Sequence, residues 1–136
     1  MNPEDAHIQK THSAICKELV GQVEWIESGK FSRIGLTTNH KMRVDEKGLI
    51  HGGFTFGLAD YAAMIAVNEP NVVLLSSSVK FLKPVRLGEQ LTARARIVES
   101  EGRKKKVWSE VLNQEQQKVL EGEFLCLVLE KHVLEK

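Results

Sequence analysis

The segment 45–68 constrains the fold most, because it joins a glycine-rich helix start to a long apolar run. Between His51 and Glu69 only Asp60 carries a charge. Residues 54–67 are apolar almost all round, which is typical of a helix enclosed by its own fold rather than lying on a surface. A carboxylate on such a helix needs a partner or a chemical task.

Two features of this helix favour a chemical task. Gly52 and Gly53 open it without side chains, so a ligand can reach the unpaired backbone N–H groups and the positive end of the helix dipole. That arrangement suits a developing oxyanion. Burial should raise the pKa of Asp60 toward the range of a general base.

The spacing of Gly53 and Asp60 indicates a site shared by two chains. Seven residues at ~1.5 Å rise separate them by roughly 10 Å along the axis and leave them on nearly the same face. One small reacting group cannot touch both. In a two-fold dimer with antiparallel central helices, Asp60 of one chain can stand over the Gly53 amide of the other.

The motif HGGFTFGLAD, followed by a small apolar helix and later by FLKPVRLGE, resembles the hotdog-fold acyl-CoA thioesterases of the PaaI-like (phenylacetate-degradation) type. The resemblance covers nearly the whole chain. It implies one α+β hotdog domain over residues 1–136, a homodimer or a dimer of dimers, and hydrolysis of an acyl-CoA thioester without a cofactor. By that resemblance, Gly53 polarises the thioester carbonyl, and the Asp60 of the partner chain acts as base or nucleophile.

The chain departs from the family pattern at two positions. Where the family usually carries an asparagine, six residues before His51, this chain has Asp45, which cannot donate a hydrogen bond when ionised. Asp45 is protonated, orients water, or points away. In some family members a strand residue with a hydroxyl group positions the water, and the corresponding residue here is Leu74. We expect Ser76 and Ser78, two and four residues on, to lie on the same strand face as Leu74 and to supply the missing hydroxyl.

The remaining candidates concern substrate contacts around the helix. Gly52 and His51 are substrate-binding candidates, although capping of the helix start is the favoured role for His51. The apolar helix residues Phe54, Phe56, Tyr61 and Met64 could shape an acyl pocket, with ordinary core packing as the favoured alternative. The basic run 103–106 is interpreted first as a solvated turn and second as a contact for coenzyme A phosphates.

The rest of the pattern predicts a sheet around the helix. Alternation at Leu91, Ala93, Ala95 and Ile97 is typical of a strand that packs one face on a helix, whereas the unbroken apolar run 124–129 favours a central strand. We expect an N-terminal helix over residues 3–20 and a polar loop over 39–48, with Pro70 stopping the central helix. The expected strands are a hairpin, 21–26 and 31–37, and an antiparallel meander, 72–81, 90–99, 105–112 and 118–129.

Composition narrows the function classes. Nineteen basic and eighteen acidic residues give no overall field that favours nucleic acid or a membrane as partner. Cys16 and Cys126 lie far apart without a CxxC motif, and neither a leader nor a long apolar run is present, which predicts a cytoplasmic protein. Metal-ligand spacings, GxSxG and phosphate-binding glycine motifs are absent from the sequence. The alternatives are a non-catalytic acyl-CoA-binding hotdog module and, more weakly, a hotdog dehydratase or hydratase.

Overall fold

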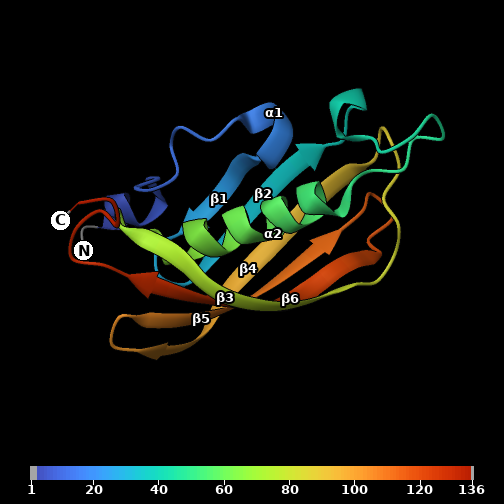
Figure 1. Cartoon of the computed structure of the whole chain (residues 1–136). Helices are drawn as coiled ribbons and strands as arrows, with labels where there is room; N and C mark the ends of the chain where they lie inside the picture. The colour runs from blue at the N-terminus through green and yellow to red at the C-terminus, as the bar shows by residue number, and fades with distance from the viewer. Residues whose placement is uncertain (1–2, 136) are drawn as a thin grey trace.

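The computed structural model describes residues 3–135, in which one antiparallel six-stranded sheet curves around a long helix, α2 (Gly52–Val67) (Figure 1). Two short helical segments lie at the N-terminus and a third in the loop before α2. These are η1 (Pro3–His7), α1 (Lys17–Val20) and η2 (His40–Met42). The strands are β1 (Gln22–Glu27), β2 (Phe31–Thr37), β3 (Val72–Phe81), β4 (Gln90–Glu101), β5 (Lys104–Leu112) and β6 (Lys118–Val128).

Helix α2 is buried along most of its length, as its apolar sequence predicts. Every residue from Tyr61 to Val67 is at most 3% exposed. The helix ends before Pro70, because Asn68 adopts the left-handed conformation (φ 53°, ψ 45°) and its N–H caps the Met64 carbonyl. The Asn68 side chain also bonds the backbone of Ile8 and Lys10, which ties the N-terminal segment to the helix end.

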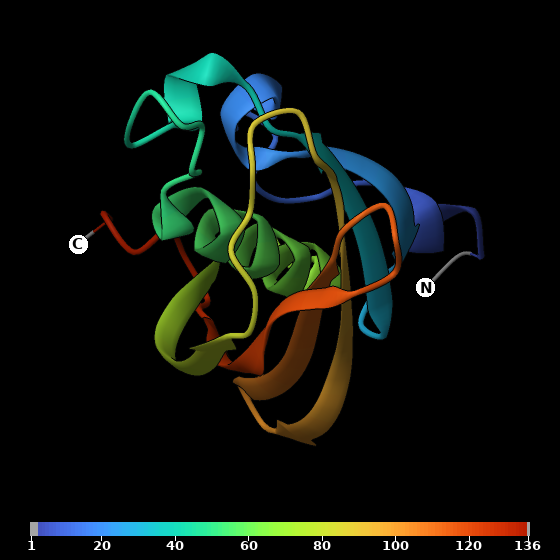
Figure 2. The same ribbon diagram turned by 90° about the vertical axis from the view of Figure 1, so that its right-hand side faces the viewer.

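The sheet order is β1-β2-β4-β5-β6-β3, and this corrects one expectation. The hairpin of β1 and β2 and the meander of β4, β5 and β6 are confirmed. Strand β3, however, pairs with β6 at the far edge instead of with β4, which follows it in sequence. Strand β3 is therefore an edge strand, and the chain between β3 and β4 crosses the end of the sheet (Figure 2).

The inner face of the sheet packs against α2 to form the core. Leu91, Ala93 and Ala95 are at most 2% exposed, as their alternation predicts, while Ile97 is only partly buried. Strand β6 lies between β5 and β3, with Phe124 and Cys126 fully buried.

The N-terminal segment is not the single helix expected over residues 3–20. Two short helical turns, η1 and α1, replace it. His12 has a positive φ of 57° between them, and a continuous helix cannot pass through a left-handed residue. The loose apolar spacing here serves to place Ile15, Leu19 and Val20 against the core. Among the described residues, no helix has the length and apolarity needed to cross a membrane.

Candidate active site

The start of α2 is capped by its own chain. The Nδ1 atom of His51 accepts a hydrogen bond from the Gly53 N–H at 3.0 Å, which is the capping arrangement favoured from the sequence. The Gly52 N–H has no acceptor among the described residues. One N–H at the positive end of the helix is therefore open, and the neighbouring one is held by an exposed imidazole.

The two glycines leave room for aromatic rings close to the helix start. A Cβ at Gly52 would lie 3.1 Å from Cε1 of Phe81, and one at Gly53 would lie 3.3 Å from Cε1 of His51. Both distances are tighter than ordinary van der Waals contact, so a side chain at either position would push a ring away. The absence of side chains thus lets both rings lie directly against the helix start.

Asp60 lies two turns further along α2 with an unsatisfied oxygen. Its Oδ1 atom is buried and has no hydrogen-bond partner, and burial raises the pKa of Asp60 from 3.8 to about 6. A buried carboxylate without a partner costs stability, so such groups usually have a functional reason. Asp60 is therefore largely ionised at neutral pH while remaining more basic than an ordinary aspartate.

The surroundings of Asp60 come from β6. Phe56 lies one helical turn before Asp60, and its ring centroid is 5.5 Å from that of Phe124 on β6. Cys126 follows Phe124 by two residues on the same strand. Burial, and then the Asp60 charge, raises the pKa of the Cys126 thiol to about 12. Phe54 and Phe56 are half-buried on this part of the helix and remain candidates for an acyl pocket. Tyr61 and Met64 instead belong to the core, at 3% and 1% exposure.

The prediction that Ser76 and Ser78 share a strand face with Leu74 is wrong. A register irregularity between Leu74 and Ser76 adds one residue to β3, so the alternation of side chains shifts. Leu74 is paired with buried Cys126, but Ser76 and Ser78 are paired with Leu125 and Glu123 on the outer face of the sheet. The serine on the helix side is Ser77, because it pairs with Phe124, which packs against Phe56. Sequence reasoning missed Ser77, since a bulge breaks the period of two.

Asp45 is exposed and held by its own loop. Its Oδ1 accepts the N–H groups of Lys47 at 2.9 Å and Leu49 at 3.3 Å. The carboxylate thus shapes the loop that leads into α2. Of the three alternatives for this residue, the structure favours a side chain that points away from the helix start.

The basic run 103–106 follows the tight turn at Gly102 between β4 and β5. Arg103 pairs with Glu130, and Lys106 pairs with Glu99 at 3.3 Å. The Lys105 ammonium donates to the Ser100 hydroxyl at 2.6 Å. These local partners favour the solvated-turn interpretation.

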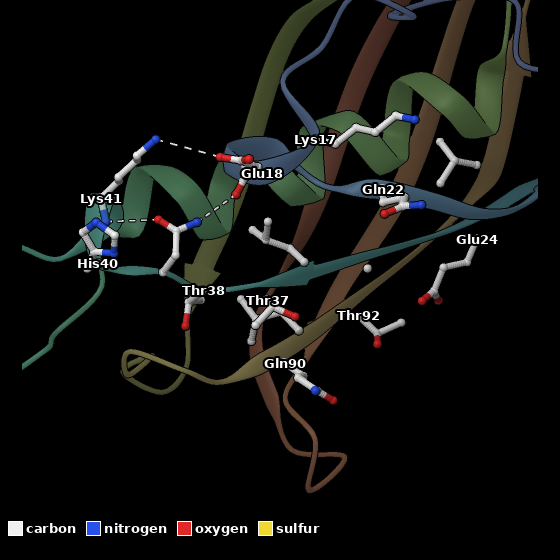
Figure 3. A pocket seen from close by; sticks show the side chains of 15 residues that line it. Lys17, Glu18, Gln22, Glu24, Thr37, Thr38, His40, Lys41, Gln90 and Thr92 are labelled. Atoms are coloured by element: carbon white, nitrogen blue, oxygen red, sulfur yellow. Dashed lines mark hydrogen bonds and ion pairs between the residues drawn. The ribbon is translucent and has the colours of Figure 1, made fainter.

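A hollow of about 970 Å³ lies away from the predicted site residues (Figure 3). It is bounded by α1, η2 and the adjoining ends of β1, β2 and β4, and none of the predicted site residues lines it. Its charged groups are of both signs, with Lys41 placed 3.9 Å from Glu18. Among residues 3–135, no group of three His, Cys, Asp or Glu side chains could hold a metal. Both cysteines are free, Cys16 exposed and Cys126 buried.

The family model of the thioesterase superfamily matches residues 47–120, which include α2, β3, β4 and β5. The chain belongs to the thioesterase superfamily. The match extends from the loop before the capped helix start through Asp60 to the first residues of β6. It covers the two glycines and Asp60, whereas Asp45 and Cys126 lie outside it.

Solved structures carry the same hotdog fold. An uncharacterised protein, PH1136 from Pyrococcus horikoshii, is 54% identical, with a TM-score of 0.91 over 94% of this chain and 97% of that one. The E. coli PaaI protein of the phenylacetic acid degradation operon is 25% identical, with a TM-score of 0.79 over 89% of this chain and 88% of that one. The protein smu.793 of Streptococcus mutans, solved with acetyl-CoA, is 27% identical, with a TM-score of 0.77 over 89% of this chain and 97% of that one. These neighbours confirm the PaaI-like hotdog fold.

A curated relative from Aquifex aeolicus, named methylthioribose-1-phosphate isomerase, is 48% identical over 120 residues, or 88% of this chain. The chain spans only 26% of the length of that protein. The similarity therefore concerns one region of a longer polypeptide.

Proposed function

We propose that this chain hydrolyses acyl-CoA thioesters to the free acid and coenzyme A, at a site that two copies share. Membership of the thioesterase superfamily and the likeness to a neighbour solved with acetyl-CoA support the substrate class. The observation that carries the proposal is Asp60, whose buried oxygen lacks a partner on a helix that otherwise holds no charge.

The thioester carbonyl would bind at the start of α2. The Gly52 N–H is open, and the Gly53 N–H becomes available when the His51 imidazole turns aside. Both would stabilise the oxyanion that forms as the carbonyl is attacked, together with the helix dipole.

Asp60 would activate the attacking group. As a general base it takes a proton from water, the resulting hydroxide adds to the carbonyl carbon, and the carbon–sulfur bond breaks to release the coenzyme A thiolate. As a nucleophile it would attack the carbonyl itself and form an anhydride that water then cleaves. A pKa of about 6, raised by burial, suits either role near neutral pH.

Two features support a shared site. Gly53 and Asp60 lie roughly 10 Å apart along one helix, too far for a single carbonyl group to touch both. In addition, β3 is an edge strand of ten residues with Leu75 and Phe81 exposed at 54% and 58%. Exposed apolar edges tend to pair with another chain. A two-fold axis beside β3 would bring the α2 helices of two copies close together.

The test is release of free thiol from a panel of acyl-CoAs. Asp60→Asn should keep the fold and lower kcat/KM by a factor on the order of 10² or more. Glu115→Gln, at an exposed position in the β5–β6 loop, is the matched control and should hydrolyse like the wild type. Wild-type turnover by a folded Asp60→Asn variant removes Asp60 from the mechanism.

A second candidate is an acyl-CoA-binding module without turnover. The observation in its favour is that Asp45 stands where the family usually has an amide donor and is bound to its own loop. Calorimetric binding of acyl-CoA without thiol release would support this candidate. Asp45→Asn separates the two further, since a gain in turnover would show that the missing amide limits catalysis.

A further inference from the structure

Two loops form the end of the molecule that lies opposite the chain termini (Figure 1). They are residues 43–49, which lead into α2, and residues 82–87, which follow β3. An antiparallel bridge between Leu49 and Arg86 joins the two loops. They therefore present one continuous surface, which we call the loop-end surface.

The loop-end surface exposes four apolar side chains. Val44 and Leu49 come from the first loop, Leu82 and Leu87 from the second, and each is 41% to 53% exposed. Ile50, next to Leu49, is 4% exposed, so the alternation of this extended segment turns Leu49 outward. Apolar side chains gathered in this way on a surface mark a contact with another protein or with a membrane.

Three cations stand among these apolar side chains. Lys47, Lys83 and Arg86 have no ion-pair partner within the described part of the chain. Arg86 lies beside Leu49 on the outward side, because residues bridged across an antiparallel pair share a face. The loop-end surface thus combines apolar groups with positive charge that no neighbouring carboxylate holds.

The acidic groups of the same region do not cancel this charge. Asp45 accepts two N–H groups of its own loop, and Glu46 lies 3.7 Å from Arg43. Residues 41–51 and 80–89 together hold six Lys or Arg and three Asp or Glu, a net charge of +3. Because the whole chain carries +1, the remainder carries −2. Positive charge is concentrated at one end of the molecule, which the overall composition conceals.

We propose that the loop-end surface binds the surface of an anionic lipid bilayer. Its apolar side chains enter the boundary between headgroups and acyl chains, and its cations meet the lipid phosphates. Binding of this kind grows with the apolar area that is buried and with the attraction between basic side chains and anionic lipid. The loop-end surface supplies both contributions.

The combination of groups favours a bilayer over other occupants. A free phosphate, a nucleotide or a nucleic acid would engage the cations and leave the apolar side chains in water. A protein partner would need a surface of matching shape, and none of the four apolar side chains lines the hollow of about 970 Å³. A bilayer accepts separate apolar side chains at the end of a molecule without any such match.

The loop-end surface adjoins the start of α2. The His51 N–H donates to the Met42 carbonyl, and the Ile50 N–H donates to the Val85 carbonyl, each at 2.9 Å. A bilayer on the loop-end surface therefore lies beside the site proposed for the thioester. Entry of a long-chain acyl thioester from the lipid follows from this placement and rests on the proposed function. The bilayer contact itself does not, because it is measured without substrate.

Cosedimentation with lipid vesicles tests the contact in the absence of any thioester. Vesicles of phosphatidylglycerol and phosphatidylcholine should bind the wild type at ~0.1 M salt, and vesicles of phosphatidylcholine alone should bind it far less. Binding should fall at ~1 M salt, because the screening length drops from about 10 Å to about 3 Å. The variant with Lys47→Gln, Lys83→Gln and Arg86→Gln should bind about a hundredfold less tightly, at about fivefold per cation.

The matched control removes three exposed cations outside the loop-end surface, with Lys10→Gln, Lys30→Gln and Lys104→Gln. It has the same net charge as the loop variant and should bind vesicles like the wild type. Thermal melting establishes that both variants fold. A wild type that does not bind the anionic vesicles overturns the proposal. So does a control that loses as much binding as the loop variant, because the location of the cations would then be irrelevant.

A second pair of variants tests the apolar contribution. Val44→Ser with Leu82→Ser should weaken vesicle binding about tenfold while binding stays salt-dependent. Val133→Ser with Leu134→Ser, two exposed apolar residues near the C-terminus, is the control and should bind like the wild type. If the Val44 and Leu82 variant also binds like the wild type, the cations recognise phosphate alone and the proposed insertion is wrong.

Discussion

His51 and Gly53 form a hydrogen bond in which the imidazole Nδ1 accepts the backbone N–H at 3.0 Å. The donor proposed for the thioester carbonyl is therefore already engaged by the helix cap. Cap and substrate compete for one N–H, and the exposed imidazole is the group that can move. The cap stabilises the helix while the site is empty, and it must open for Gly53 to contribute to catalysis.

Replacing His51 separates these two effects. His51→Ala should lower the free energy of unfolding by about 1 kcal/mol, the usual cost of a lost N-cap. It should raise kcat/KM several-fold, since the carbonyl no longer competes with the imidazole. His51→Asn keeps a side-chain acceptor at the N-cap and should resemble the wild type in both respects. Urea unfolding and thiol release measure the two quantities. A hundredfold loss of turnover in His51→Ala would instead assign the imidazole a role in catalysis.

The bulge in β3 yields a prediction with two internal controls. Ser77 lies on the helix side of the strand, while Ser76 and Ser78 lie on the outer face. Ser77→Ala should lower kcat/KM by about fivefold if its hydroxyl holds the attacking water, because one hydrogen bond contributes about 1 kcal/mol. Ser76→Ala and Ser78→Ala should leave kcat/KM unchanged. Equal effects of all three substitutions would contradict the assignment.

Local pattern was enough to predict much of the molecule. The apolar run of α2 and the alternation of β4 are set by burial, and both are recovered with nearly correct bounds. The lone charge of Asp60 and the paired glycines also indicated a candidate site from the sequence, and the role of these residues stays a prediction.

The features that sequence reasoning missed depend on distant partners. The place of β3 beside β6 is a pairing between residues that are far apart in sequence, and nothing in β3 itself specifies it. The bulge after Leu74 exists only relative to β6, so the faces of the following serines could not be read from alternation. The His51 cap was favoured from the sequence, but its conflict with the oxyanion donor became visible only in the hydrogen-bond geometry.

Asp60 should make the stability of the protein depend on pH. Burial raises the pKa of Asp60 from 3.8 to about 6, so the folded protein holds this proton more tightly than the unfolded chain does. The contribution of Asp60 to the free energy of unfolding is fully present below about pH 4 and is lost as the pH rises through about 6. The loss is at most about 3 kcal/mol, from about two pKa units at 1.36 kcal/mol each.

The measurement compares unfolding free energies of the wild type and Asp60→Asn between pH 4 and pH 7.5. Because the amide does not titrate, the advantage of Asp60→Asn over the wild type should grow with rising pH. The exposed control Glu115→Gln should show no such trend. A constant difference across this range would mean that Asp60 has no raised pKa in solution.

The shared site can be tested by mixing two inactive variants. Gly53→Pro removes the N–H of a first-turn residue, where proline is tolerated, and Asp60→Ala removes the carboxylate. Each homodimer should be nearly inactive. Refolding the two together at equal concentration makes about half of the dimers mixed, if pairing is random. In each mixed dimer, one site combines an intact Gly53 from one chain with an intact Asp60 from the other.

About a quarter of the wild-type activity should therefore return, because half of the dimers carry one complete site of two. Gly53→Pro also removes the His51 cap bond, so His51→Ala serves as the control for that loss. Mass spectrometry of differently tagged chains establishes that mixed dimers are present. If they are present and activity stays at the level of the separate homodimers, Gly53 and Asp60 do not meet across the interface. The hydrolytic site would then have to be built within one chain, where the helix keeps these two groups roughly 10 Å apart.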